Sequence, residues 1–400
     1  MHPRRLASAI PPLAVTAFTA TCAAGRGTAA FAQALEARRS GLVPNTLSDL
    51  PCWVGRVAGL EEEPLAAADA VWDSRNHRLA HIGLAQDGFR ARVAAAVERY
   101  GATRVALVLG TSTSSIGETE RAYRDAGASG VFPRADSRVH NPHSLGAFVQ
   151  RELGLAGPCL SIATACSSSA KVFASAARLF AADWADAVVV GGVDTLCGSV
   201  LYGFNSLQLV SSAPCRPFDA ARDGLSLGEA AGFALLERVA VDTAAPRLVG
   251  YGESADAHHM SAPHPEGAGA ERALHDALAR AGLAPDDVDY INLHGTASRQ
   301  NDEVEARLVA RTFPARTHAG STKGWTGHAL GAAGIVEAAV ALLALERGLL
   351  PGTLNAQTLD AACGPQIRID NATREIRVAL SNSFGFGGNN CCIAFARGDA

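Results

Sequence analysis

Short hydrophobic runs recur along the chain, and several are followed by small residues and then by a helical pattern. Runs such as 104–109 (RVALVL) and 187–191 (AVVVG) are rich in β-branched residues, which is typical of buried strands. The expected strands are residues 13–18, 104–109, 158–163, 187–191, 247–251, 289–294, 377–381 and 391–395, and the expected helices are 167–182, 269–281, 328–345 and a segment through 31–35. This alternation predicts a layered α/β fold.

The first 25 residues have two interpretations. Arg4 and Arg5 precede an uncharged stretch, residues 6–24, which imitates a signal peptide or a short membrane span. Pro11 and Pro12 interrupt that stretch, and its apolar content is mostly Ala and Thr, which favour a bilayer core only weakly. We therefore favour a buried first strand over residues 13–18, with the signal peptide as the alternative.

Two further segments depart from the simple strand and helix pattern. Residues 328–345 are apolar nearly all round, but Glu337 interrupts them and Gly331, Gly334 and Gly348 flank or begin the run. This predicts a buried central helix and not a membrane span. Residues 61–99 are richer in charge and predict an exposed insertion.

Composition and charge exclude several classes of protein. Apolar residues make up 48% of the chain and charged residues 18%, which predicts a globular product. The formal net charge is −4 and no Lys/Arg run occurs, so nucleic-acid binding is disfavoured. The nine cysteines are irregularly spaced, which argues against a disulfide framework and favours a reducing cytoplasm. His258, His259 and His264 lack partners at structural-zinc spacing, so we expect no metal site.

Cys166 is the most informative candidate for chemistry. It follows the expected strand 158–163 and precedes the expected helix 167–182. This placement would expose the sulfur at a strand end, where the helix N-terminus favours the thiolate. A small buried hydrophobe is the alternative, and the local sequence does not separate the two.

Two histidines favour the catalytic interpretation. His294 lies at the end of an expected strand before Gly295 and Thr296, and His328 lies in a Gly-rich turn at the start of the apolar helix. Each histidine alone is more often a core residue than a catalyst. A thiolate with two such imidazoles can form an acyl thioester and polarise a second carbonyl.

Four separated motifs resemble those of elongating β-ketoacyl-[acyl-carrier-protein] synthases. They are Thr164-Ala165-Cys166-Ser167-Ser168, His294-Gly295-Thr296, residues 323–334, and Asn382-Ser383-Phe384-Gly385-Phe386-Gly387-Gly388-Asn389. The resemblance spans about residues 100–397. It implies a thiolase-like, duplicated, five-layer αβαβα fold with two mixed sheets. The N-terminal half, 1–240, would carry Cys166 and an insertion around 52–100; the C-terminal half, 241–400, would carry both histidines.

The resemblance also assigns roles to individual residues. Cys166 would receive an acyl chain from the phosphopantetheine of an acyl carrier protein, with no permanently bound cofactor. His294 and His328 would hold the malonyl thioester, so that loss of carbon dioxide leaves a stabilised enolate. The backbone N–H groups of Cys166 and Phe386 would form the oxyanion hole. Lys323 and Glu337 would form a supporting ion pair, with Lys323 as a proton donor the alternative.

Further roles concern access to the thiol. Thr296 would bind the pantetheine arm, and Ser298 stands where the family has a second such hydroxyl. The gate would consist of Phe386 with Gly385, Gly387 and Gly388, facing a second loop around Asp256 that contains the three histidines 258, 259 and 264. Residues 166–173 (CSSSAKVF) and 201–215, which include Phe204, look like the ketosynthases of bacterial aryl polyene clusters. A straight acyl pocket would then have Thr113 in its far wall and Phe204 beside it.

Two rival functions have sequence tests. A thiolase would use a second catalytic cysteine in a C-terminal Cys-Gly turn, where this chain has Gly385-Phe386-Gly387-Gly388. A chain-length partner subunit would lack the nucleophile, whereas Cys166 and both histidines are present. The family usually forms dimers, so we expect a homodimer or a heterodimer with a chain-length-factor-like homologue. A cytoplasmic location would supply carrier-bound malonyl groups.

Overall fold

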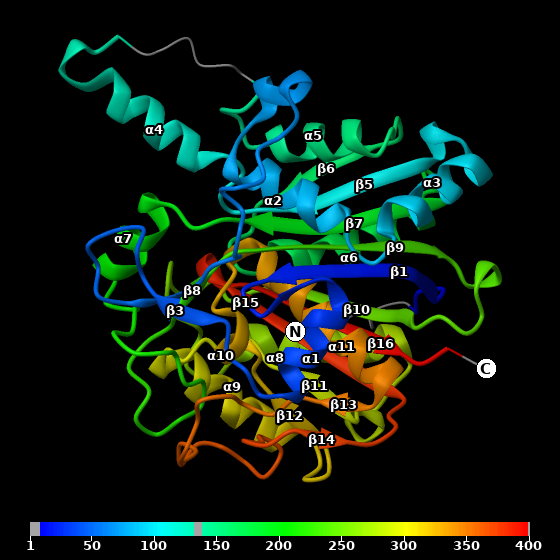
Figure 1. Ribbon diagram of the computed structural model, residues 1–400. Helices are drawn as coiled ribbons and strands as arrows, with labels where there is room; N and C mark the ends of the chain where they lie inside the picture. The colour runs from blue at the N-terminus through cyan, green and yellow to red at the C-terminus, as the bar shows by residue number, and fades with distance from the viewer. Residues whose placement is uncertain (1–8, 132–137, 399–400) are drawn as a thin grey trace.

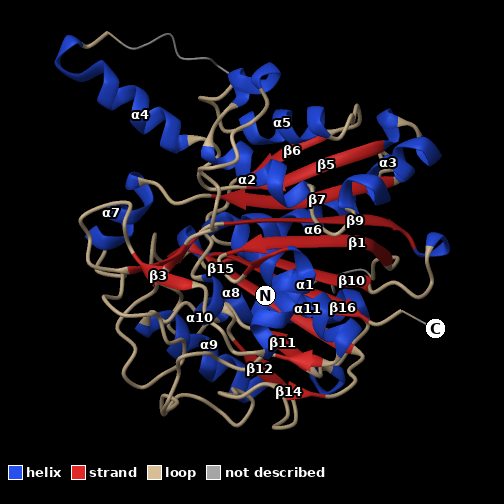
Figure 2. Cartoon of the chain, in the orientation of Figure 1, coloured by secondary structure: helices blue, strands red, loops and turns tan. Residues whose placement is uncertain are grey.

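A mixed sheet of eleven strands organises the protein (Figures 1 and 2). The computed structural model describes residues 9–131 and 138–398. In spatial order one end of the sheet contains β10 (Arg247–Ala255), β16 (Asn389–Ala396), β15 (Val378–Gly385), β11 (Tyr290–Asn292) and β12 (His318–Gly320). The other end contains β1 (Leu13–Cys22), β9 (Ala230–Arg238), β7 (Ala187–Asp194), β5 (Val105–Gly110) and β6 (Cys159–Ile162), with β2 (Gly25–Arg26) paired to β1.

The two sets of five strands repeat one topology. In each set the first strand in the chain pairs antiparallel with the last, the last pairs antiparallel with the fourth, and the second lies parallel between the fourth and the third. The sets join where β1 meets β10 over two residue pairs, Leu13 with Leu248 and Ala14 with Arg247. The expected duplicated α/β fold with mixed sheets is therefore confirmed.

Helices cover both faces of the two strand sets. The helices are α1 (Gly27–Glu36), α2 (Arg75–Leu84), α3 (Phe89–Tyr100), α4 (Ile116–Ala126), α5 (Ser144–Glu152), α6 (Ser168–Ala181), α7 (Gly198–Ser206), α8 (Ala268–Ala281), α9 (Arg299–Thr312), α10 (Lys323–Thr326) and α11 (Ala333–Arg347). The central helices α6 and α11 contact each other and strands of both sets. Helices α2, α3 and α5 share one outer hydrophobic cluster with strands of the first set, and α8 and α9 share another with strands of the second. Figure 1 shows α4 projecting away from the layers.

Two small sheets complete the fold. They are β3 (Leu42–Pro44), β4 (Trp53–Gly55) and β8 (Leu227–Gly228) in one, and β13 (Leu349–Leu350) with β14 (Ala372–Thr373) in the other. Residues of β4, β8 and α7 pack in a separate hydrophobic cluster beside α10 and the turn that follows it.

The N-terminal segment is a strand of the main sheet. β1 lies between β9 and β10, and residues such as Leu13, Ala14 and Val15 are buried, so the strand interpretation is confirmed. Arg4 and Arg5 lie outside the described residues. Every helix within the described residues is too short or too polar to cross a membrane. Residues 333–347 form a central helix whose Glu337 is also buried, as expected.

The prediction of an exposed insertion over 61–99 agrees with 61–73, which are exposed or half-buried, but is wrong for the inner faces of α2 and α3. α2 and α3 bury Leu79, Phe89 and Val93 against the first set of strands. Their charged residues lie on the outer face of amphipathic helices, which a count of charges alone does not distinguish from a solvated loop. Residues 61–64 are exposed, as expected.

Candidate active site

Cys166 lies in the turn between β6 and α6. The turn requires a positive φ of 53° at Ala165, just before the cysteine. It is stabilised by the Ser168 hydroxyl, which accepts a hydrogen bond from the Thr164 N–H at 2.9 Å. The helix begins at Ser168, so the sulfur lies at its N-terminus, as the sequence predicted.

His294 follows β11 and is held by a buried carboxylate. Glu305 on α9 accepts hydrogen bonds from the N–H groups of His294 and Gly295, at 2.9 and 2.8 Å. Gly295 has a φ of 37°, and a Cβ there would lie 2.5 Å from the Cβ of Ser321. Glycine is therefore required directly after this histidine.

His328 lies in the turn after α10, not at the start of the long helix. Its N–H donates to the Ser226 carbonyl at 2.7 Å. Gly327 and Leu330 have φ values of 69° and 53°, which are incompatible with an α-helix, so α11 begins only at Ala333. The expected helix 328–345 was too long at its N-terminal end for this reason.

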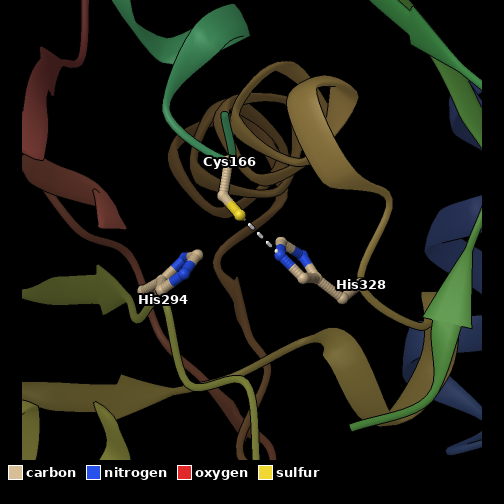
Figure 3. A group of neighbouring side chains, drawn as sticks. All are labelled: Cys166, His294 and His328. Atoms are coloured by element: carbon tan, nitrogen blue, oxygen red, sulfur yellow. Dashed lines mark hydrogen bonds between the residues drawn. The ribbon is translucent and has the colours of Figure 1, made fainter. Parts of the chain in front are cut away.

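These three residues converge on one buried point (Figure 3). His328 Nε2 lies 2.9 Å from Cys166 Sγ, and the centroids of the two imidazole rings are 5.4 Å apart with the rings nearly perpendicular. One ligand-type atom from each residue lies within 4.8 Å of the others. All three side chains are nearly inaccessible to solvent. The predicted nucleophile and both predicted histidines therefore lie together.

Lys323, at the start of α10, contacts both His294 and Glu337. Its ammonium contacts the His294 carbonyl oxygen and Glu337 Oε1, and lies 3.5 Å from His294 Nδ1. Because an ammonium can only donate, Nδ1 must accept and the ring proton lies on Nε2, toward the cysteine. The predicted ion pair between Lys323 and Glu337 is present in the structure and is buried.

Burial dominates the electrostatics of the site. It lowers the pKa values of His294 and His328 well below 6.5, and the positive charge of Lys323 lowers both further. Burial raises the pKa of the Cys166 thiol to about 11, while Lys323 and a backbone hydrogen bond from Phe386 oppose that rise. At neutral pH the resting site thus contains a protonated thiol and neutral imidazoles, which differs from the thiolate expected from the helix N-terminus.

The same donors could also ligate a transition metal, since one sulfur and two imidazoles are common zinc ligands. The neighbouring ammonium of Lys323 argues against this, because a second cation would lie close to the first in a dry site. The arrangement suits chemistry on a neutral thioester better than storage of a cation.

A cavity of about 250 Å³ leads to the sulfur. Its described lining includes Cys166, Phe204, Gln208, Asp256, Ser261, His294, Thr296, Ser298, Asn301, His328, Phe386 and Asn390. The Thr296 and Ser298 hydroxyls lie 2.9 Å apart within this lining. A passage that leads to a buried thiol and has two hydroxyls in its lining fits a long, flexible thioester arm.

Phe386 lies over the cavity beside Phe204. Their rings stack with centroids 5.4 Å apart, and Phe204 also meets the edge of His328 at 6.4 Å. The neighbouring glycines, Gly387 and Gly388, have φ values of 73° and 71°, which favours glycine at both positions. Gly385 also lines the cavity.

The loop around Asp256 faces the Phe386 segment. The Asp256 N–H donates to the Gly388 carbonyl at 2.9 Å, and Asp256 Oδ1 accepts from Asn390 Nδ2 at 2.8 Å. His258 and His259 are exposed in this loop, and His264 is half-buried. The interpretation of these histidines as loop residues agrees with that placement.

Thr113 is not in the described lining of this cavity, so its place in an acyl pocket stays a prediction. Its hydroxyl donates to Asp194 Oδ1 at 2.6 Å and accepts from Asn76 at 2.9 Å. Asp194 binds the whole turn after β5, and its other oxygen accepts from the Ala332 N–H at 3.1 Å. A side chain of similar size without a hydroxyl could not make these two hydrogen bonds in place of Thr113.

Sequence reasoning missed two buried carboxylates that shape the site. Glu305 fixes the backbone of His294, and Asp194 connects the turn after β5 to the turn that follows His328. Burial raises the pKa of Glu305 to about 7, against the hydrogen bonds from Gly295 and His294. The Asp302 and Glu305 pair, spaced three apart before a hydrophobic run, was the available signal for α9 and its buried acids.

Comparisons with known proteins agree with this geometry. A model of the β-ketoacyl synthase N-terminal domain matches residues 11–241, and a model of the β-ketoacyl synthase C-terminal domain matches 246–357. The chain is 32% identical to 3-oxoacyl-[acyl-carrier-protein] synthase 2 of Coxiella burnetii, over 75% of this chain and 77% of that protein. It is 33% identical to nodulation protein E of Rhizobium meliloti, over 79% of this chain and 80% of that protein.

Solved structures give the same picture. A ketosynthase (ApeO) in complex with its chain length factor (ApeC) from Xenorhabdus doucetiae matches with a TM-score of 0.88 and 34% identity, over 97% of this chain and 98% of that one. A β-ketoacyl synthase from Burkholderia phymatum matches with a TM-score of 0.87 and 27% identity, over 98% of this chain and all of that one.

Proposed function

The chain belongs to the β-ketoacyl synthase family, and we propose that it condenses a Cys166-bound acyl chain with a carrier-bound malonyl group to give a β-ketoacyl thioester. The observation that carries this proposal is the 2.9 Å contact of Cys166 Sγ with His328 Nε2 in a cavity that His294 also lines. The reaction class is acyl transfer with carbon–carbon bond formation.

In the first half-reaction Cys166 takes the acyl chain from an acyl carrier protein. The sulfur attacks the thioester carbonyl, the carbon–sulfur bond to the phosphopantetheine arm breaks, and the thiol proton passes by way of His328 Nε2 to the leaving sulfur. Because burial lowers the pKa of His328, this imidazole is neutral and able to accept the proton. Thr296 and Ser298 line the passage and would bind the arm. The arm enters with each substrate and is not a resident cofactor.

In the second half-reaction a malonyl thioester replaces the departed carrier. Its carbon–carbon bond to the carboxylate breaks, carbon dioxide leaves, and the electron pair forms an enolate. The Nε2–H of His294 would donate to the enolate oxygen, and His328 would do the same in the tautomer that has its proton on Nε2. Lys323 fixes the donor tautomer of His294, which supports a positioning role for Lys323 and Glu337 over direct proton donation.

The enolate carbon then attacks the acyl carbonyl. A carbon–carbon bond forms, the bond from the acyl carbon to Cys166 Sγ breaks, and the thiolate takes up a proton. The N–H groups of Cys166 and Phe386 would stabilise the intermediate oxyanion, which is worth roughly 3 kcal/mol per donor in sites of this kind. The presence of Cys166 and Phe386 in the same cavity lining supports this assignment. Phe386 would act as the gate, with Gly385, Gly387, Gly388 and the Asp256 loop.

We infer a polyunsaturated acyl substrate of the aryl polyene type. The support is the run 166–173 together with the 34% identity to a ketosynthase that was solved with its chain length factor. By the same likeness we propose that the partner is a second copy or a chain-length-factor-like homologue. The halves 1–240 and 241–400 would each contribute to the site. A cytoplasmic location would give access to malonyl carrier protein.

A thiolase-type reaction is the alternative, and two cysteines bear on it. Cys391 and Cys392 lie in β16 and are fully buried outside the cavity lining of the described chain. Neither is available as the second catalytic thiol of a thiolase. A condensation driven by decarboxylation needs one thiol, which Cys166 supplies.

The test is to transfer acyl chains from carrier proteins to this protein and to measure its intact mass. The chain is incubated with a series of saturated and polyunsaturated acyl carrier proteins, with and without a chain-length-factor-like homologue, and acyl transfer is followed by intact mass. We expect a single acyl adduct on Cys166, strongest with polyunsaturated chains, and β-ketoacyl product after malonyl carrier is added.

Two variants make the result specific. Cys166→Ala should show no adduct, whereas Cys197→Ala, which removes a half-buried cysteine elsewhere, should load normally. Absence of an adduct with every carrier, with and without the homologue, would refute the enzyme assignment. Product formed from two acetyl thioesters without malonyl carrier would favour the thiolase reaction.

A further inference from the structure

The first turn of α6 contains an unusual cation, Lys171. Lysine occurs at two positions in the chain, 171 and 323, among 35 Lys and Arg residues. Lys323 belongs to the active site, and Lys171 lies five residues after Cys166. A positive charge near a helix N-terminus is electrostatically unfavourable. Lys171 is also half-buried, so its placement needs a compensating contact.

That contact is to the segment that carries Phe386. Lys171 Nζ donates to Asn389 Oδ1 at 3.2 Å, and Asn389 Nδ2 donates to the Phe386 carbonyl at 3.4 Å. An ammonium has donors only, so it can bind the oxygen of an amide side chain and not the nitrogen. Lys171 therefore fixes the orientation of the Asn389 amide, which directs Nδ2 toward Phe386.

The backbone hydrogen bonds of Gly387 and Gly388 connect this segment to the Asp256 loop. The Gly387 N–H donates to the Met260 carbonyl at 2.8 Å, and the Gly388 carbonyl accepts from the Asp256 N–H at 2.9 Å. Both partners lie in the Asp256 loop, where Met260 is 78% exposed. Such a loop can move together with the segment it contacts. Lys171, by contrast, connects the segment to α6, the helix that begins beside Cys166 and is buried between the strand sets.

We propose that Lys171 is a positioning residue that holds the Phe386 segment closed over Cys166 through the side chain of Asn389. The inference rests on the proposed role of Phe386 as the gate. In the closed position the Phe386 ring stacks on Phe204, and both rings line the cavity that contains Cys166. Loss of the Lys171 contact shifts the segment toward open positions, which admits the acyl chain more readily but misaligns the oxyanion donor.

The direct test needs no substrate. Hydrogen–deuterium exchange of the peptide that spans residues 384–391 is compared in the free protein and in Lys171→Met. We expect exchange at Gly387 to become about five-fold faster or more, the size that loss of one partly exposed charged hydrogen bond produces. Unchanged exchange in Lys171→Met overturns the proposal, whatever the enzyme catalyses.

Three further variants distinguish loss of the Lys171–Asn389 contact, here called the latch, from a general loss of stability. Lys171→Arg retains a donor and should keep slow exchange. Arg178→Met removes another cation of α6, one that pairs with Glu253, and should leave the peptide unchanged. Asn389→Asp keeps the acceptor for Lys171 but loses the donor to Phe386, so it should accelerate exchange as Lys171→Met does. In the double variant Lys171→Met, Asn389→Asp, the peptide should then exchange no faster than in the faster of the two single variants. Additive acceleration would show that Lys171 and Asn389 do not act through one chain of hydrogen bonds.

A catalytic readout follows the two half-reactions separately. In Lys171→Met, acyl transfer to Cys166 should be as fast as in the unaltered protein or faster, while condensation with malonyl carrier becomes several-fold slower. A merely destabilised protein would lose both rates together, and that result overturns the latch. If exchange accelerates as expected but no carrier ever loads Cys166, the latch stands and the proposed enzymatic function fails.

Discussion

A cation and two neutral imidazoles share one buried site, and their spacing decides what each group can do. Burial lowers the pKa of His294, and Lys323, which lies 3.5 Å from His294 Nδ1, lowers it further and also fixes the ring tautomer. His328 instead faces the thiol through Nε2. One histidine is thus a committed donor, while the other can exchange a proton with sulfur. The two imidazoles are therefore not equivalent in the reaction.

Removing the His294 side chain should slow the malonyl half-reaction and spare acyl transfer to Cys166. His294→Ala should lower the rate of malonyl decarboxylation about 10²- to 10³-fold, the usual effect of losing one oxyanion donor. Formation of acyl-Cys166 should persist, because His294 takes no part in that step. Intact mass follows acylation, and released carbon dioxide follows decarboxylation. His275→Ala, an exposed histidine on α8, is the control. Equal loss of both rates would contradict this division.

The pH profile tests the effect of the Lys323 charge. Catalysis needs neutral imidazoles, and their pKa values lie well below 6.5, so activity should persist as the pH falls through 6.5. The double variant Lys323→Met, Glu337→Leu removes a cation that lowers both pKa values. Those values should rise, so the residual decarboxylation should begin to fall at a higher pH. Burial still lowers the pKa values of the two histidines in this variant, so the acid limb of the pH–activity profile should remain below pH 6.5.

The double substitution is chosen because a single one would leave an unpaired buried charge, which costs more than replacing the whole pair by apolar groups. Arg347→Met, at the exposed end of α11, is the matched control and should not move the limb. An acid limb at the same pH in the double variant would show that Lys323 does not set the histidine pKa values.

Single residues with chemistry, and the Lys323–Glu337 pair, could be predicted from the sequence, whereas the supporting carboxylates Glu305 and Asp194 could not. Cys166, His294 and His328 each stand at a strand end or a Gly-rich turn, which is visible locally. Glu305 binds the backbone of His294 from eleven positions away, and Asp194 reaches Ala332 from another half of the fold. Such contacts depend on how the elements pack, and a local pattern contains no information on that.

At the scale of elements, the site depends on how closely α6 and α11 cross. A Cβ at Gly334, at the start of α11, would lie 2.5 Å from the Ala170 nitrogen of α6. Cys166 lies just before one helix and His328 just before the other. Any separation of the two helices therefore changes the distance from sulfur to imidazole.

Gly334→Ala should test that crossing. Forcing a methyl group between packed helices costs about 1–3 kcal/mol of the free energy of unfolding. We also expect slower acyl transfer, because His328 Nε2 moves from the sulfur. Urea denaturation and the acylation rate are measured together. Gly203→Ala in α7 is the control, since a Cβ there meets nothing within 4 Å and should be neutral or stabilising. A Gly334→Ala protein with unaltered stability would contradict the close crossing.

The elements themselves were predicted where hydrophobic periodicity is strong. The expected strands and the helices over 167–182 and 269–281 agree with the structure to within a few residues at most ends. β9 was missed because its sequence, AAGFALLER, contains helix formers that the neighbouring strands override. α9 was missed because its buried face includes Asp302 and Glu305, which bind backbone groups and interrupt the apolar stripe.

At the scale of the molecule, the site lies where the two strand sets meet around the central helices. Cys166 follows the third strand of one set, and Lys323 and His328 follow the third strand of the other. His294 follows the second strand of its set, whose counterpart in the first set, β5, ends at Gly110 just before Thr111. Duplication thus places equivalent strand ends on either side of one cavity, and substitutions in each half give them different chemistry.

Among the described strands, β6 is the outermost of the first set, and its outer edge points to the partner. Leu107 N–H binds the Pro158 carbonyl and Thr111 N–H binds the Ile162 carbonyl, so Cys159 and Ser161 of β6 direct their backbone groups away from β5. Leu160 is 40% exposed on the same strand. Unpaired strand edges of this kind readily pair with another chain. We expect the proposed dimer, with a second copy or a homologue, to form along β6.

Ser161→Pro should prevent that pairing, because proline has no N–H to offer the neighbouring strand. Light scattering after size exclusion should give twice the chain mass for the unaltered protein, or the mass of a complex when the homologue is added, and a single chain for the variant. Ser161→Ala loses the side-chain contact with His143 but keeps the N–H, so it should still pair. A dimer of unaltered stability in Ser161→Pro would show that another surface joins the subunits.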